Sequence, residues 1–357
     1  MTRPAPARLA ALALAGGLLA AAAAGCGDDG GGGEAAPTTV RLLTHDSFTV
    51  SDEVLEAFTE ETGLELEVIQ GGDAGTVVNQ ALLSKGNPQA DVLFGIDSTF
   101  LSRALDEGLF TAHEAEGIDG IDEAFVLDPE HRVTPVDYGD VCLNFDVEWF
   151  AENRLPVPET FEDLVDPRYR DLLVVENPAT SSPGLAFLLA TIEATGEDGW
   201  EDWWTALRAN GVEVVAGWEE AYNGAFSGGS GQGTRPLVVS YASSPPAEVA
   251  FADPPVEEAP TGVIEATCYR QVELAGVLAG TDRPEAAGRL VDFMLSRTFQ
   301  EDLPMSMFVF PVDPDAALPE VFVEHAARPA QVLEMEPERI AAGREGWIDR
   351  WTDLVVR

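Results

Sequence analysis

The chain has 357 residues, with 20 Lys and Arg against 63 Asp and Glu, which gives a formal net charge of −43. This excess of acid excludes direct binding to nucleic acid, because phosphate contacts need clustered cations and the chain contains a single lysine, Lys85. A hydrophobic content of 45%, with 7 Trp and 17 Phe, excludes a disordered chain. The length suits about two domains, and the charge fits a solvated acidic exterior.

The first segment has the features of an export signal. Residues 1–25 carry two arginines and no acid around an apolar stretch of 16 residues, which is shorter than the roughly 20 that span a bilayer. The stretch ends in Ala-Ala-Gly before Cys26 and resembles the lipobox of bacterial lipoproteins. We therefore predict a lipoprotein signal peptide over 1–25, lipidation of Cys26 and a Gly/Asp-rich tether over 26–37. The alternative is a plain signal peptide with an incidental cysteine.

Short strands and helices alternate over the next 60 residues. We predict strands over 40–43, 64–69 and 91–96 and helices over 51–61 and 76–83. This order is typical of an open, mainly parallel sheet covered by helices. Ligands of such sheets bind beyond the carboxyl ends of the strands. The polar residues at these ends are candidates for a site, although each alone also suits a turn or a helix cap: His45, Asp46, Asp73 and Asp97.

The second half of the chain repeats this pattern less regularly. We predict strands over 172–175, 212–216 and 237–241 and a helix over 185–194. The segment before this helix contains Ser181, and the free amides of a helix start can bind an anion. Trp218 and Tyr241 lie at strand ends, where they suit stacking on a ligand and packing in the core equally well.

Two extended segments join these halves, one over 135–140 and one around Cys268, and we interpret them as strands that cross between two lobes at a hinge. Cys142 and Cys268 lie in these segments. In an exported protein we expect them to form a disulfide, with two buried reduced thiols as the alternative. Helices are predicted over 284–296 and 337–354, the second with a pair of packing tryptophans, Trp347 and Trp351.

The sequence lacks the motifs of the common catalytic and metal sites. None of the four histidines has a second ligand at metal spacing, and no HExxH occurs. The glycine-rich run 228–233 fits neither the P-loop nor the GxSxG elbow. We therefore expect no catalytic residues, no metal and no cofactor.

Nine short runs of the sequence together form a recognisable pattern. They are THDSF (44–48), ADVLFGID (90–97), DYG (137–139), TSSPGL (180–185), GWEEAY (217–222), VSYASSP (239–245), RQVE (270–273), FVFPV (308–312) and GWI (346–348). In residues and order, from about residue 38 to the C-terminus, they resemble the thiamine-binding subunits of ATP-driven (ABC) thiamine importers, which are type II solute-binding proteins. The TSSPGL, GWEEAY and SYASSP runs are the most specific of them.

The resemblance implies an α/β fold of the periplasmic-binding-protein type II class, in which two mainly parallel sheets flanked by helices are joined by two hinge-crossing strands. The expected lobes are 38–138 plus 272–357 (lobe 1) and 139–271 (lobe 2). It further implies an exported monomer, held at the outer face of the cell membrane by the lipid anchor or free in the periplasm. Such a protein captures thiamine or a thiamine phosphate by closure of the lobes and delivers it to the permease of an ABC importer.

The resemblance also implies the residues of the site. The aromatic positions that hold the rings of the ligand match His45, Trp218, Tyr241 and Phe308, and Tyr222 lies in the same GWEEAY run. Asp73 matches an acidic contact, Ala74 supplies a backbone amide, and Ser181 suits the hydroxyl or phosphate end. Asp46 and Asp97 are expected close to the cation.

Three positions depart from the family pattern. The family usually has Tyr where His45 stands, Trp where Phe308 stands, and an aromatic residue where Ala247 stands. These differences suggest a wider pocket or weaker binding. A protonated His45 beside a cationic ring would also repel it, which introduces a dependence on pH.

Other functions remain open from the residues alone. Carboxylates with aromatic rings also suit a polyamine, whereas a ferric-ion carrier would need clustered phenolates and the five tyrosines include no adjacent pair. An extracellular hydrolase would need a nucleophile with its base, and an inert envelope scaffold would bind no small ligand.

Overall fold

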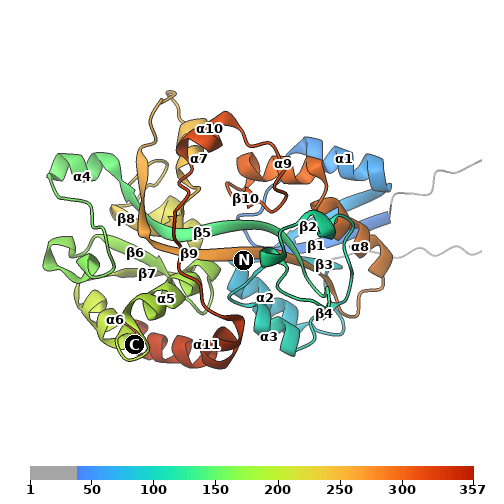
Figure 1. Ribbon diagram of the computed structural model, residues 1–357, viewed down its shortest axis with the longest axis horizontal. Helices are drawn as coiled ribbons and strands as arrows, with labels where there is room; N and C mark the ends of the chain where they lie inside the picture. The colour runs from blue at the N-terminus through green and yellow to red at the C-terminus, as the bar shows by residue number, and fades with distance from the viewer. Residues whose placement is uncertain (1–37) are drawn as a thin grey trace, which may run out of the picture. The chain divides into compact units, whose positions relative to one another are not determined.

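The computed structural model describes residues 38–357, whose strands form one mixed sheet (Figure 1). The order of the sheet is β2-β1-β3-β9-β5-β8-β6-β7, with β10 paired to β5 and β4 paired to β9. The strands are β1 (Thr38–Thr44), β2 (Leu64–Gln70), β3 (Val92–Asp97), β4 (Phe110–Thr111), β5 (Thr134–Asp146), β6 (Leu173–Glu176), β7 (Glu213–Val215), β8 (Leu237–Tyr241), β9 (Thr261–Leu278) and β10 (Phe310–Pro311).

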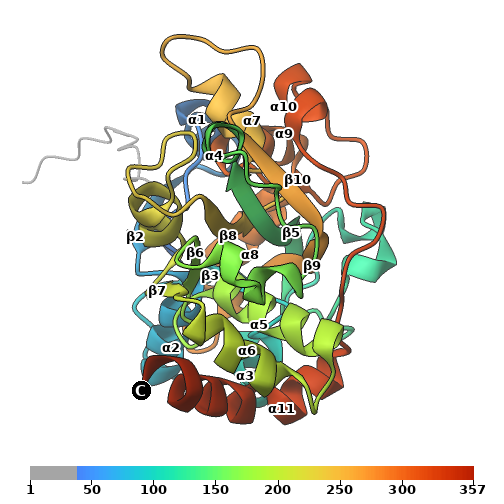
Figure 2. The same ribbon diagram turned by 90° about the vertical axis from the view of Figure 1, so that its left-hand side faces the viewer.

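Helices flank the sheet on both sides (Figures 1 and 2). The chain also contains two short π-helices, η5 (Glu220–Ala225) and η6 (Thr352–Val356). The α-helices are α1 (Asp52–Thr62), α2 (Ala74–Leu83), α3 (Leu101–Asp106), α4 (Val147–Asn153), α5 (Ser182–Thr195), α6 (Trp200–Ala209), α7 (Pro245–Ala250), α8 (Pro284–Met294), α9 (Arg297–Ser306), α10 (Glu320–His325) and α11 (Pro337–Trp351). Within residues 38–357, no helix combines the length and the hydropathy needed to cross a bilayer.

The sheet is parallel at both ends and antiparallel in the middle. At one end β1 pairs in parallel with β2 and β3, and at the other end β6 pairs in parallel with β7 and β8. Between them, β5 and β9 run antiparallel to each other and to their outer neighbours. The 13 residues of β5 and 18 of β9 reach about 43 and 60 Å at about 3.3 Å per residue. The expected two crossing strands are therefore confirmed, and they join the two parallel sheets into one.

A disulfide bond links the two crossing strands. It joins Cys142 of β5 to Cys268 of β9, 126 residues apart in sequence. The bond lies where the β5–β9 pairing shifts register between Val141 and Leu143. A bridge that closes so long a loop restricts the unfolded chain, an effect of about 2–5 kcal/mol on stability. The two strands are thus fixed to each other at the irregular part of their pairing.

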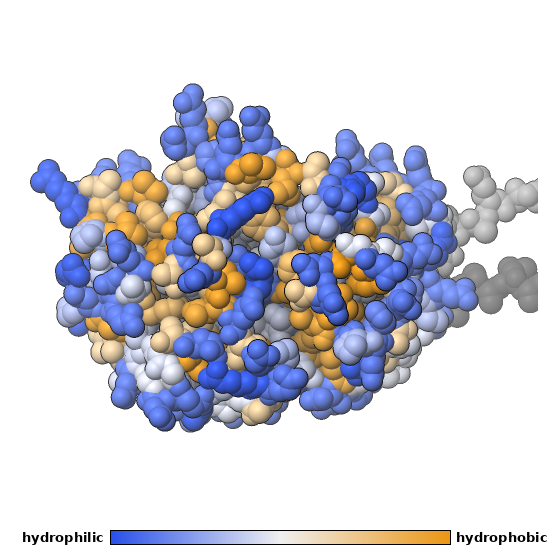
Figure 3. Space-filling view, viewed as in Figure 1, coloured by the Kyte–Doolittle hydropathy of each residue, from blue (hydrophilic) through white to orange (hydrophobic). Residues whose placement is uncertain are grey.

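The largest hydrophobic cluster includes residues from both halves of the sheet, such as Leu43 of β1 and Leu237 of β8. Trp347 and Trp351 of α11 are buried, which confirms their expected packing role. The Trp351 ring lies edge-on to that of Trp204 in α6, with centroids 5.4 Å apart. The C-terminal helix therefore also packs against the segment expected to form lobe 2, and the boundaries of the lobes stay a prediction. On the face shown in Figure 3, hydrophilic side chains are interspersed with patches of hydrophobic ones.

Candidate functional site

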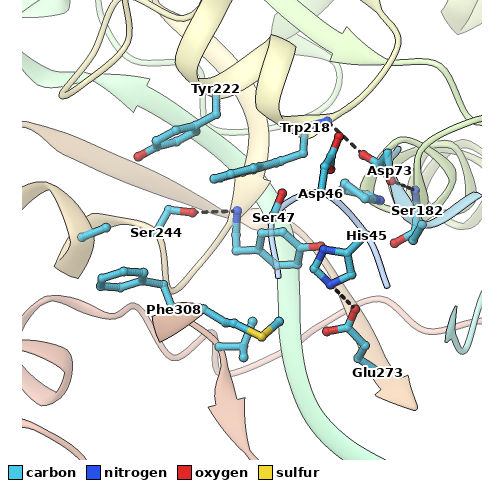
Figure 4. Close-up of a pocket in the computed structure, with 16 residues that line it drawn as sticks. His45, Asp46, Ser47, Asp73, Ser182, Trp218, Tyr222, Ser244, Glu273 and Phe308 are labelled. Carbon is cyan, nitrogen blue, oxygen red and sulfur yellow. Dashed lines mark hydrogen bonds and ion pairs between the residues drawn. The ribbon is translucent and has the colours of Figure 1, made fainter. Parts of the chain in front are cut away.

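A pocket lies where the carboxyl ends of β1 and β8 meet the starts of α2 and α5 (Figure 4). The space within it is ≈ 710 Å³ when the part open to solvent is included, and the cavity proper measures ≈ 110 Å³. Its lining combines aromatic rings with carboxylates and serine hydroxyls. The lining residues are His45, Asp46, Ser47, Asp73, Ala74, Ser182, Pro183, Trp218, Tyr222, Tyr241, Ser244, Ala247, Glu273, Met307, Phe308 and Val309.

The pocket brings together most of the residues predicted from the sequence. The predicted residues that line it are His45, Asp46, Asp73, Ala74, Trp218, Tyr222, Tyr241 and Phe308. The structure places Asp97 and Ser181 behind the lining, where both are buried. The Ser181 hydroxyl accepts a hydrogen bond from the Gly184 amide and so caps α5, and its neighbour Ser182 lines the pocket instead.

Asp97 is turned toward the interior by its own hydrogen bonds. Its Oδ1 accepts from the backbone and the hydroxyl of Thr99, and its Oδ2 accepts from the Gln271 amide at 2.8 Å. Burial raises the pKa of Asp97 to about 6. Gln271 also donates to the Ser182 hydroxyl at 2.8 Å, so Asp97 is connected to the pocket wall through the amide of Gln271.

His45 follows β1 and forms an ion pair with a residue of the crossing strand β9. Its Nε2 lies 3.1 Å from Oε1 of Glu273 (Figure 4). The His45 ring also packs against Gly95 of β3. A Cβ on Gly95 would lie 2.5 Å from the His45 ring, so β3 needs glycine at this position. Burial acts to lower the pKa of His45, but the carboxylates of Glu273, Asp73 and Asp46 outweigh it and raise that pKa above its ordinary value.

Asp73 directly precedes the first residue of α2 and connects the start of this helix to the opposite side of the pocket. Its Oδ1 accepts a hydrogen bond from the Ser182 amide at 3.1 Å, and its Oδ2 accepts from the Trp218 amide at 2.9 Å. Both dashed lines are drawn in Figure 4. Burial raises the pKa of Asp73, and the two amides partly oppose this rise. The carboxylate therefore joins a residue of the expected lobe 1 to two backbone donors of the expected lobe 2.

The aromatic wall of the pocket is built on the segment after β7 and on β8. The ring of Trp218 stacks on that of Tyr222, with centroids 5.0 Å apart and planes 14° from parallel, and its Nε1 donates to the Ser240 hydroxyl at 2.9 Å. Tyr241 donates its hydroxyl to Gln271 Oε1 at 2.8 Å. These contacts orient the indole and phenol planes within the lining of the pocket.

Phe308 forms the facing part of the lining, after α9. It has a left-handed backbone, with φ 54°, and its ring meets the edge of Phe251 with centroids 5.6 Å apart. Phe251 is 71% exposed and lies four residues after Ala247, where the family usually has its additional aromatic residue. Phe251 therefore packs its ring against Phe308 from the same segment, but it does not itself line the pocket.

Glu273 is the main residue of the site that the sequence analysis missed. It lies in β9 opposite Asp137 of β5, and burial together with the nearby Glu273 carboxylate raises the pKa of Asp137 well above its ordinary value. A buried carboxyl at the end of β6, Glu176, also has its pKa raised well above the ordinary value by burial. Glu273 therefore lines the pocket, whereas Asp137 and Glu176 are buried outside its lining. Within residues 38–357, no group of three or more His, Cys, Asp and Glu has the arrangement of a metal site.

Comparison with known proteins defines the class to which this fold and pocket belong. Residues 87–331 match the family model of bacterial extracellular solute-binding proteins. The chain therefore belongs to this family of exported binding proteins.

Its most similar relatives include periplasmic proteins named for thiamine. The chain is 31% identical to the thiamine-binding periplasmic protein of Salmonella typhimurium, covering 90% of this chain and 95% of the relative. It is also 31% identical to that of Escherichia coli, with the same coverage. The solved structure of a periplasmic thiamin binding protein superposes with a TM-score of 0.79, at 28% identity, over 90% of this chain and 97% of that one.

Proposed function

We propose that this protein captures thiamine between its two lobes and delivers it to an ABC importer. The observation that carries the proposal is a pocket in which the aromatic side chains of Trp218 and Phe308 are combined with the carboxylates of Asp46, Asp73 and Glu273. The similarity to thiamine-binding periplasmic proteins over 90% of the chain supports the same ligand.

Thiamine matches the chemistry of this pocket group by group. Its aminopyrimidine and thiazolium rings are flat, and the thiazolium carries a permanent positive charge. The exposed face of Trp218 suits a stacked cationic ring, a contact worth about 0.5–2 kcal/mol. The carboxylate of Glu273 supplies the opposite charge, and the hydroxyls of Ser47 and Ser244 suit the hydroxyethyl arm.

Binding would act through closure of the lobes. We propose lobes of residues 38–138 plus 272–357 and residues 139–271, with β5 and β9 as the hinge. The pocket is lined from both, by His45 and Glu273 on one side and Trp218 and Tyr241 on the other. A ligand that contacts both sides stabilises the closed state and shifts the hinge equilibrium toward it. The closed form is then the form that the permease recognises.

Calorimetry tests the proposed ligand directly. We expect the protein without its signal segment to bind thiamine with sub-micromolar affinity. Putrescine and spermidine, whose flexible chains present no ring to Trp218, should compete weakly, and ferric ion should not displace thiamine. Absence of heat with thiamine at tens of micromolar would refute the assignment, and tighter binding of spermidine would favour the polyamine carrier.

We further propose that the protein is exported as a monomeric, non-enzymatic lipoprotein. The predicted signal peptide, the lipid-bearing Cys26 and the tether lie outside the described residues, and the family of exported binding proteins supports this location. The variant Cys26→Ser lacks the thiol that carries the lipid. It should therefore be found in the soluble exported fraction rather than in the membrane fraction. A wild-type protein that is fully soluble after export would instead favour a plain signal peptide.

A further inference from the structure

The side-chain amide of Gln271 connects three residues around the pocket. Its Nε2 donates to Oδ2 of Asp97 and to the hydroxyl of Ser182, and its Oε1 accepts from the hydroxyl of Tyr241, each at 2.8 Å. Gln271 is 5% exposed and does not itself line the pocket. Both hydrogens of the amide and its oxygen are therefore used, and the side chain has one defined orientation.

Asp97 determines which way round this amide lies. The pKa of Asp97 is about 6, so its carboxyl is ionised at neutral pH and only accepts hydrogen bonds. It requires the NH₂ group of Gln271 on its own side, which leaves the amide oxygen for the other side. Next to it, the Ser98 amide donates to the Val272 carbonyl at 3.0 Å. This bond holds the end of β3 against β9 and keeps the carboxylate beside the amide.

The amide oxygen of Gln271 in turn determines what Tyr241 offers to a ligand. The phenol has one hydrogen and donates it to Gln271, so its oxygen can only accept a further hydrogen bond. The ring lies against Gly139, which pairs with Gln271 in the β5–β9 register, and a Cβ on Gly139 would lie 2.8 Å from it. Thiamine has two groups able to donate to such an oxygen, the amino group of its pyrimidine and the hydroxyl of its arm.

We propose, on the basis of the proposed function, that Gln271 is a positioning residue for ligand binding. It presents the Tyr241 oxygen as an acceptor for a hydrogen-bond donor of the ligand. It also ties Tyr241 and Ser182 of the proposed lobe 2 to Asp97 of the proposed lobe 1. Without this amide the phenol hydrogen is free to turn toward the ligand, where it opposes a donor, and the two sides of the pocket lose their common partner.

Titration calorimetry of Gln271→Met tests the proposal. Methionine keeps the length of the side chain and removes all three hydrogen bonds, so thiamine should bind at least about tenfold more weakly than to the wild type. Affinity equal to that of the wild type would overturn the inference and leave thiamine binding itself intact. If the wild-type protein does not bind thiamine, the proposed function fails instead.

A second buried amide provides a control for a general loss of stability. Asn210 is also 5% exposed, and its Nδ2 donates to the carbonyls of Leu164 and Asp166 at 2.9 and 3.0 Å, outside the pocket lining. Asn210→Leu should lower the melting temperature, as Gln271→Met does, and leave the affinity for thiamine unchanged. Equal losses of affinity in the two folded variants would overturn the proposal, because destabilisation alone would then explain them.

A double-mutant cycle with Tyr241→Phe shows whether Gln271 acts through the phenol. Phenylalanine keeps the ring and removes the hydroxyl, so Tyr241→Phe should itself weaken thiamine binding. Gln271→Met should then cost less affinity in the Tyr241→Phe protein than in the wild type, and strictly additive losses would contradict a role through this hydroxyl. If Gln271→Met does not fold, a folded Tyr241→Phe protein with wild-type affinity would overturn the proposal by itself.

The pH dependence of binding distinguishes positioning from a loss of packing. The Gln271 amide stabilises the ionised form of Asp97, so Gln271→Met should raise the pKa of Asp97 and shift the acidic limb of the affinity profile to higher pH. The ionisable groups that face Asp97 are unchanged in this variant and are Glu273, Tyr241, Tyr269 and Arg344. An acidic limb at the same pH in both proteins would contradict the link between Gln271 and Asp97 on which the proposal depends.

Discussion

Replacement of Trp218 by alanine should weaken thiamine binding by at least about 1 kcal/mol, roughly fivefold, because the largest flat surface of the pocket is lost. The indole is held in the pocket lining by its stacking on Tyr222 and by its bond to Ser240. Thiamine should also quench the fluorescence of the wild-type protein mainly through this residue. Calorimetry and fluorescence titration of the same samples measure both effects.

Two further variants test whether the loss of affinity and of quenching is specific to the indole of Trp218. Trp218→Phe keeps an aromatic face but loses the bond to Ser240, so its affinity should lie between those of the wild type and Trp218→Ala. Trp347→Phe changes a buried tryptophan of α11 that does not line the pocket, and the quench by thiamine should remain. Unchanged affinity in Trp218→Ala would place this residue outside the binding site.

Thiamine binding should strengthen as the pH rises from about 5 to 8, with release of protons on binding. The pKa of Asp97 is raised to about 6 by burial, and the carboxylates around His45 raise the pKa of that residue despite its burial. A permanent cation in the pocket disfavours the protonated form of both groups and therefore lowers both pKa values. By linkage, affinity increases with pH by up to about tenfold per unit for each proton released.

Calorimetry in buffers of different ionisation enthalpy measures the protons directly. The release should be on the order of one proton near pH 6, the pKa of Asp97, and the contribution of Asp97 should be lost at pH 8, where this carboxyl is already deprotonated. The variant His45→Gln removes one of the two titrating groups and should show a shallower pH dependence. Identical apparent enthalpies in all buffers, or proton uptake, would show that the cation does not lie close to these groups.

The sequence analysis found the parts of the site that depend on local structure. Residues such as His45 and Trp218 follow strands, and strand ends of an open sheet face the ligand in any protein of this type. Helix α6 was not predicted, although its buried Trp200, Trp203, Trp204 and Leu207 repeat at the spacing of a helix face. That pattern was available in the sequence and could have identified the helix.

Other residues could not be placed without the fold. Glu273 lies in the middle of an extended segment, and its orientation toward the pocket depends on the register of β9 with β3 and β5. Asp97 lies at the end of a strand, as the sequence analysis required of a site residue. Hydrogen bonds from Thr99 and Gln271 nevertheless hold its carboxylate in the interior. The occupation of the Ser182 and Trp218 amides by Asp73 joins segments more than 100 residues apart, which no local pattern encodes.

The position of β9 in the sheet has a consequence for the order in which the chain can fold. β3 near the N-terminus finds its partner in β9, where Val92 pairs with Val277 and Asp97 with Glu273. The first three strands therefore cannot complete their sheet until most of the chain has been synthesised, and such non-local pairing is slow. A nascent chain that remains unfolded for this time is in the state that a secretion channel requires, so the topology itself favours export before folding.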